Sequence, residues 1–144
     1  MITRRAALEA GAVALGAIAV GGVVGAEARY GLGVLLPHRA DEWPWATLLT
    51  NMSGCLLIGV LMVVITERVR PHPLVRPLLG VGVLGGYTTF STYTVDTVTA
   101  VHAGRADLAV LYAVATPLLA MVAVAVGAMV TRRLMPDRRR EVGS

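Results

Sequence analysis

The sequence predicts an all-α membrane protein with four transmembrane helices. Of its 144 residues, 56% are hydrophobic, and the mean hydropathy of +0.68 is far above that of a soluble domain of this size. A bilayer core needs about 20 apolar residues per helix, and the chain offers four such runs with short connections. We expect one domain, residues 1–144, with helices over residues 8–36, 45–66, 74–100 and 108–132.

The first run begins with a pattern that imitates an export signal. Arg4 and Arg5 precede the apolar residues, and Ala26-Glu27-Ala28 has the form of a cleavage site. Cleavage there would leave three helices. We interpret the run as a retained transmembrane helix, because it continues apolar beyond the pattern and because the rest of the chain is itself a membrane protein.

The same run carries a small-residue face and one arginine. Gly21 and Gly25, with Ala17 one turn earlier, would let another helix backbone approach closely. Arg29 costs roughly 2.5 to 3.5 kcal/mol toward the bilayer centre on insertion scales. It is therefore expected either to extend to the membrane interface or to lie at a pore mouth, where it attracts anions.

The second run places one amide on a face of small residues. Asn51, Cys55 and Gly59 recur at intervals of four residues. Asn51 is either a hydrogen-bonding contact between helices or a donor to a permeating anion. Cys55 is the only cysteine, which excludes an intramolecular disulfide, and we interpret it as a packing residue.

The third run contains the most unusual stretch, Gly85 to Tyr93. It holds two adjacent glycines, three aromatic rings and the hydroxyls of Thr88, Thr89, Ser91 and Thr92. Lipid cannot satisfy polar or irregular backbone, so such a stretch must be buried in protein or line a watery path. The glycines predict a helix broken near mid-membrane, with carbonyls suited to a cation and amide groups suited to an anion.

Aromatic residues in this stretch have a second possible role. Phe90 and Tyr93 are three residues apart and share a helix face, beside Thr89, Thr92 and Asp96. Ring edges are electropositive, so two edges at a narrow pore can replace part of the hydration of an anion. The alternative is ordinary aromatic packing.

The fourth run shows a similar polar stripe. Tyr112 and Thr116 are four residues apart, with Pro117 next to them. Two hydroxyls in line suit a polar track beside a pore. The alternative is a Thr bonded to its own helix and a Tyr at the interface. Pro117 predicts a kink or a loosened hydrogen bond.

Three motifs in this order resemble the small bacterial fluoride channels called Fluc or CrcB, over nearly the whole chain. The third motif is highly specific, whereas the first alone would be weak. The motifs are Gly21-Gly22-x-x-Gly25-Ala26-x-x-Arg29-Tyr30, Thr47-x-x-x-Asn51-x-x-Gly54-x-x-x-x-Gly59 and Gly82-x-x-Gly85-Gly86-x-Thr88-Thr89-Phe90-Ser91-Thr92-Tyr93.

The resemblance implies an antiparallel, dual-topology dimer with two fluoride pores and a structural sodium ion. It implies that the backbone carbonyls of Gly85 and Thr88 hold the sodium. The residue expected at the pore mouth is Arg29. Asp96 falls where the family often has Glu. The pore-lining residues expected for this chain are Asn51, Phe90, Ser91, Thr92, Tyr93, Tyr112 and Thr116.

Tyr93 departs from the family pattern, which usually has Phe at this position. A hydroxyl on that ring can alter anion coordination. It leaves open whether both pores of an assembly conduct.

Arginine is distributed unevenly over the two sides of the expected membrane protein. All thirteen basic residues are Arg. Arg39 and Arg105, with Arg29 near its helix end, lie on one side. The positive-inside rule therefore predicts a multi-pass protein of the bacterial cell membrane with both termini in the cytoplasm. The cytoplasmic side would carry Arg4, Arg5, Arg68, Arg70, Arg76, Arg132, Arg133, Arg138, Arg139 and Arg140.

A fixed orientation has a consequence for assembly. A chain with only one orientation cannot form an antiparallel dimer with itself, so we favour a heterodimer with a homologous subunit inserted the other way. A homodimer is the alternative. The basic residues lack interleaved aromatic residues, which indicates contact with the lipid bilayer and not with nucleic acid.

The function that these observations favour is passive export of fluoride, which enters cells as hydrogen fluoride and is trapped after it ionises. One alternative is a small multidrug-type antiporter using Glu27 or Asp96 to exchange protons. Another is a non-conducting partner subunit of a heterodimeric channel. Enzymatic activity is not expected, because the sequence has no nucleophile-base pair, phosphate loop or zinc ligand set. The histidines, which we expect to be solvated, are scattered in loops at His38, His72 and His102.

Overall fold

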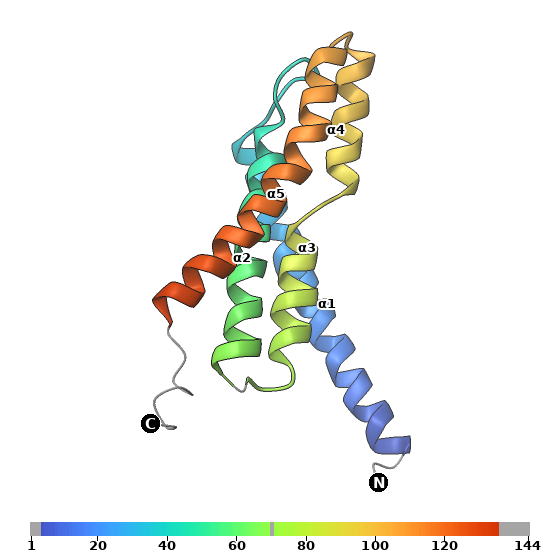
Figure 1. Ribbon diagram of the computed structural model, residues 1–144. Helices are drawn as coiled ribbons and strands as arrows, with labels where there is room; N and C mark the ends of the chain where they lie inside the picture. Colours follow the sequence, from blue (N-terminus) through green and yellow to red (C-terminus); the bar gives the residue numbers. More distant parts are fainter. Residues whose placement is uncertain (1–3, 70, 136–144) are drawn as a thin grey trace.

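A computed structural model describes residues 4–69 and 71–135 and is all-helical over that part of the chain (Figure 1). This confirms the all-α part of the predicted fold class. Two of the helical segments have the wider π-helical turn. The elements in chain order are α1 (Arg4–Leu35), α2 (Trp45–Val63), η1 (Val64–Arg68), η2 (Arg76–Leu84), α3 (Gly85–Tyr87), α4 (Ser91–His102) and α5 (Ala106–Leu134).

Three helical stretches within the described residues are long and apolar enough to cross a membrane. They are Leu8–Leu35, Trp45–Arg68 and Ala106–Leu134. The run expected over residues 74–100 is not one of them, because it consists of η2 with α3, followed by α4. Residues 88–90 between these segments are not helical. Three of the four expected helices are therefore continuous, and the remaining one is divided.

The elements form two packed groups (Figure 1). In the lower half of the view α1 lies beside η2 and α3, and in the upper half α4 lies beside α5. α2 packs against α5. The connections at residues 36–44 and 103–105 meet at one end, where Arg105 donates a hydrogen bond to the Asp41 carbonyl at 3.1 Å. In that loop a backbone hydrogen bond, and then the Arg39 guanidinium, lower the pKa of the Asp41 carboxyl.

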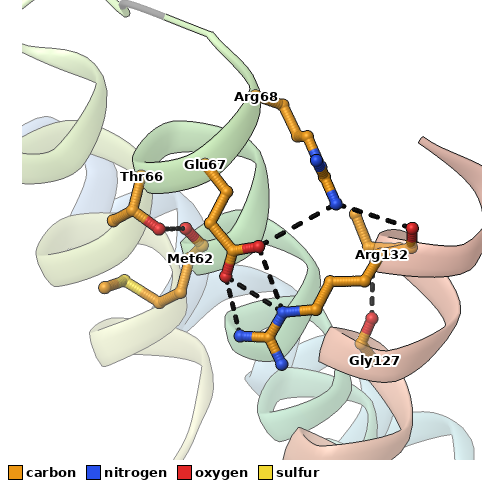
Figure 2. Close-up of polar contacts among 7 residues, drawn as sticks. Met62, Thr66, Glu67, Arg68, Gly127 and Arg132 are labelled. Carbon is orange, nitrogen blue, oxygen red and sulfur yellow. Dashed lines mark hydrogen bonds and ion pairs between the residues drawn. The ribbon is translucent and has the colours of Figure 1, made fainter. Parts of the chain in front are cut away.

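The opposite end is held by an ion-pair cluster between η1 and α5 (Figure 2). Both carboxylate oxygens of Glu67 accept hydrogen bonds from Arg132, the shortest at 2.7 Å. Arg68 approaches Glu67 at 3.9 Å and donates to the Arg132 carbonyl. The Arg132 side chain is 56% exposed, so solvent screens this pair and it adds little to stability. The pair links η1 to α5.

Glycines bring the backbones of α1 and the third run into direct contact. A Cβ on Gly25 would overlap the Val83 carbonyl oxygen, and a Cβ on Gly86 would overlap the backbone of Gly22. The close approach expected from the small-residue face of α1 is thus present. It fixes α1 against the segment that carries the site.

Replacing Gly25 with alanine is expected to destabilise the protein by about 1 to 3 kcal/mol, the usual cost of overpacking. The added methyl would meet only backbone atoms, including the Tyr87 amide nitrogen at 2.7 Å, which cannot move aside as a side chain can. Gly22→Ala is the matched control, since a Cβ there has no neighbouring atom within 4 Å. Thermal unfolding of the purified protein in detergent measures both, and equal losses would contradict this assignment.

Candidate functional site

The site is built around the non-helical residues 88–90. Thr88 has extended backbone, with φ −74° and ψ 155°, which ends α3. Asn51 on α2 then bonds both sides of Thr89: its side-chain amide donates to the Thr89 carbonyl at 2.9 Å, and its oxygen accepts from the Thr89 amide at 2.8 Å. Asn51 thereby supplies the hydrogen bonds that a helix would otherwise make at Thr89. The two glycines themselves are helical.

A cluster of hydroxyls starts α4. Thr89 Oγ1 accepts a hydrogen bond from the Thr92 amide at 3.1 Å and donates to Thr92 Oγ1 at 3.0 Å. Ser91 Oγ lies 3.2 Å from the same oxygen. Phe90 is the residue directly before α4, and Thr89, one residue earlier, supplies the side-chain oxygen that accepts a hydrogen bond from the first turn of α4.

Two backbone carbonyls lose their usual helical partners at this interruption. The amide of Thr89, which would bond the Gly85 carbonyl in a helix, donates to Asn51 instead. The amide of Thr92, which would bond the Thr88 carbonyl, donates to Thr89 Oγ1. The carbonyl of Gly86, the residue after Gly85, accepts a hydrogen bond from Arg29 Nε at 3.2 Å. The described residues contain no cluster of three or more His, Cys, Asp or Glu side chains suited to a metal ion.

A cavity of about 430 Å³ adjoins the interruption. It brings together four of the sequence-predicted pore residues, Asn51, Phe90, Tyr93 and Thr116. The Phe90 ring is 80% exposed and lies 5.5 Å from the Tyr93 ring, centroid to centroid. The remaining lining residues are Cys55, Thr88, Thr89, Pro117 and Ala120.

Buried hydroxyls continue along α5 from this cavity. Tyr112 is completely buried and Thr116 is 4% exposed. Within the described part of the chain neither hydroxyl makes a hydrogen bond of normal geometry, although the hydroxyls of Thr116 and Thr47 lie close to that of Tyr112. Burying a hydroxyl without a good hydrogen bond inside an apolar helix bundle is unfavourable. A polar ligand is therefore expected to bind these two hydroxyls. The Tyr112 ring also lies 5.4 Å from Tyr93.

Asp96 lies near this stripe and has two partners. Its Oδ2 accepts from Thr47 Oγ1 at 2.6 Å, and its Oδ1 lies 3.7 Å from His38 Nε2. His38 is an exposed residue of the loop after α1, as expected, but it also faces this carboxylate of α4. No sequence signal identifies this contact, because His38 and Asp96 are joined only by the fold. Trp43, just before α2, packs edge-on against Tyr112 at 5.5 Å.

Arg29 and Thr92 belong to a second cavity of about 450 Å³, lined also by Ala26, Tyr30, Gly33 and Val34. The structure therefore separates the predicted residues into two groups. Asn51, Phe90, Tyr93 and Thr116 share one cavity, and Arg29 and Thr92 share the other. Ser91 is exposed.

These features define a helical membrane protein with unpaired polar groups buried among its apolar helices. The chain belongs to the CrcB-like family, because the family model described as "CrcB-like protein, Camphor Resistance (CrcB)" matches residues 16–128. This confirms the resemblance drawn from the sequence motifs.

Curated relatives agree with the family assignment. A Streptomyces coelicolor protein named fluoride-specific ion channel FluC 1 is 50% identical over 123 residues, which cover 85% of this chain and 79% of that protein. A Thermobifida fusca protein named fluoride-specific ion channel FluC 2 is 46% identical over 121 residues, covering 84% of this chain and 90% of that protein. Because the family's members are named as ion channels, the expectation that this chain is not an enzyme is confirmed.

Proposed function

We propose that this chain forms part of a fluoride-specific channel through which fluoride leaves the bacterial cytoplasm passively, which reduces its toxicity. The observation that carries the proposal is the pair of buried hydroxyls, of Tyr112 and Thr116, which make no hydrogen bond of normal geometry within the described residues. Hydrogen-bond donors inside an apolar bundle suit a small anion that gives up part of its water. The names of the relatives support fluoride as that anion.

The path we propose uses donors and ring edges in sequence. Arg29 attracts the anion at the mouth, and Thr92 shares that cavity. Ser91 and the buried hydroxyls of α5 replace hydration water. Asn51 has two amide hydrogens and uses one on Thr89, so one is left for the anion. The electropositive edges of Phe90 and Tyr93 then carry fluoride past the narrow part of the path.

The exposure of Phe90 supports an assembly of two antiparallel chains. Phe90 is 80% exposed and lines the cavity from one side only, so a second subunit is needed to form the other wall. A chain of 15.1 kDa is too thin to surround a selective pore alone. Each pore would lie between two subunits.

A structural sodium ion fits the donors at the interruption. The carbonyls of Gly85 and Thr88 are the two whose helical partners are diverted to Asn51 and to Thr89. Hard cations prefer oxygen donors of this kind. We infer that two such carbonyls from each subunit would hold the ion between the divided helices, near mid-membrane, and that the ion would neutralise their dipoles.

The arginine distribution supports a fixed orientation with both termini in the cytoplasm. Within the described residues Arg68, Arg76 and Arg132 lie in segments at the end opposite Arg39 and Arg105. The predictions for Arg4, Arg5, Arg70 and Arg138 to Arg140 concern side chains that the structure does not describe. A heterodimer follows if orientation is strict. Expression of the chain alone is then expected to yield no functional antiparallel dimer, and purification of an active homodimer would contradict the heterodimer.

Removing one unpaired hydroxyl is the direct test of the proposed path. Thr116→Val keeps the side-chain shape, and we expect it to slow fluoride flux by about tenfold, equivalent to about 1.4 kcal/mol. Thr131→Val is the matched control on the same helix, because Thr131 is also buried but its hydroxyl already bonds the Gly127 carbonyl at 2.7 Å. Equal flux in both variants would remove the support that the α5 hydroxyls give.

A further inference from the structure

Tyr93 makes a hydrogen bond that a phenylalanine could not make. Its hydroxyl donates to the backbone carbonyl of Ala113 in α5 at 2.7 Å. Ala113 is four residues before Pro117, which lies inside α5. In a regular helix the amide of residue 117 would bond this carbonyl, but proline has no amide hydrogen. The Tyr93 hydroxyl therefore pairs with the one carbonyl that Pro117 leaves without its helical donor.

We propose that Tyr93 and Pro117 act as a matched pair, in which the carbonyl freed by Pro117 fixes the Tyr93 ring beside the cavity and thereby permits anion passage. This inference rests on the proposed function, since it takes the cavity as part of the fluoride path. Tyr93 touches that path. Pro117 is a positioning residue that acts through the Ala113 carbonyl.

The geometry holds the Tyr93 ring from three directions. Its ring centroid lies 5.5 Å from that of Phe90 and 5.4 Å from that of Tyr112, and both pairs are tilted, by 48° and 46°. The hydroxyl proton points into α5, where it is bonded to the backbone. The hydroxyl is therefore not free to donate to an anion, and the ring carbons are what Tyr93 presents to the cavity that it lines.

The carbonyl itself matters for an anion path. Pro117 and Thr116 both line the cavity, so the unbonded Ala113 carbonyl would lie next to it. A carbonyl oxygen without a donor carries the negative end of its dipole into a medium of low dielectric, which disfavours an anion. The bond from Tyr93 removes this unfavourable charge and fixes the ring at the same time.

The test is a double-mutant cycle of Tyr93→Phe and Pro117→Ala. The protein is reconstituted in liposomes in whichever assembly gives the wild type its fluoride flux. Tyr93→Phe should slow flux by about tenfold, because it leaves the Ala113 carbonyl unpaired and the ring unanchored. Pro117→Ala should slow it comparably, because the restored amide competes for that carbonyl and displaces the Tyr93 hydroxyl. The double variant should be slowed about tenfold and not about a hundredfold, because Tyr93→Phe then removes a hydrogen bond that Pro117→Ala has already displaced.

A second tyrosine provides the control. The Tyr87 hydroxyl lies 2.9 Å from Ser53 Oγ and is not among the residues that line the cavity. The effects of Tyr87→Phe and Pro117→Ala on flux should simply multiply. If Pro117→Ala does not assemble, Pro117→Leu restores the same amide and takes its place in the cycle.

Two results would overturn the pairing. One is unchanged flux in Tyr93→Phe. The other is a Tyr93→Phe variant that loses the same fraction of fluoride flux in the wild-type and in the Pro117→Ala background. That result would mean that the hydroxyl acts on the anion directly. If the wild type carries no fluoride in any assembly, the proposed function fails, and the same cycle is read by thermal unfolding. In that measurement the pairing predicts that Tyr93→Phe lowers the unfolding temperature less in the Pro117→Ala background than in the wild type. Additive decreases in the unfolding temperature would overturn the pairing.

Discussion

Replacing Phe90 with isoleucine is expected to reduce fluoride flux by about 100-fold or more, equivalent to about 2.7 kcal/mol, while the assembly stays intact. Isoleucine is apolar and bulky but has no electropositive ring edge with which to replace the water around an anion. The Phe90 side chain is 80% exposed, so the fold of the single chain does not depend on it. Fluoride efflux from liposomes, normalised to assembled protein, measures the effect.

The matched control is Val95→Ile, which places the same side chain five residues later on an exposed position of α4. It should leave flux and assembly unchanged. Phe90→Met also tests whether a ring edge is required, because methionine is apolar and flexible but has no ring. Flux of wild-type size in Phe90→Ile would contradict the role of the ring edge.

Replacing Asn51 with leucine is expected to destabilise the fold itself, by roughly 2 to 6 kcal/mol, because it leaves two backbone groups unpaired. Asn51 and Thr89 are each 8% exposed, so water cannot replace the lost hydrogen bonds to the Thr89 amide and carbonyl. The yield of monodisperse protein and its unfolding temperature measure the loss. An Asn51→Leu protein of normal stability and no flux would contradict this support role.

Cys55→Ala serves as the control for that substitution. Cys55 lies one turn further along α2, lines the same cavity and is half-buried. Its removal should cost less than about 1 kcal/mol, since no buried backbone group depends on it. A loss as large as that of Asn51→Leu would indicate a general sensitivity of α2 rather than the specific bonds to Thr89.

The sequence predicts the all-helical class because runs of apolar residues report directly on helices in a bilayer. It also predicts that Gly21 and Gly25 bring backbones together, since small residues at helical spacing have few other uses in membranes. It does not reveal how the third run is interrupted. The glycines are helical, and the non-helical backbone at Thr88 is supported by Asn51, which is 38 residues from its partner. A hydrogen bond between residues so far apart cannot be inferred from the local sequence pattern.

The candidate site shows the same division. Tyr112 and Thr116 are visible in the sequence because both lie on one face of one helix. The contact of His38 with Asp96 is not, since it joins a loop to a residue of α4 that is 58 positions later in the chain. The bond from Tyr93 to Ala113 is also invisible, because Pro117 predicts only that some carbonyl is freed and not which side chain reaches it.

Fluoride efflux from liposomes, followed with a fluoride electrode, tests the central claim most directly. It compares this chain alone, this chain with its closest homologue from the same genome, and protein-free liposomes, each with chloride measured in parallel. We predict rapid fluoride release without chloride release from the paired chains and background release from this chain alone. Fluoride release at the protein-free rate in both preparations, despite correct assembly, would contradict the channel function.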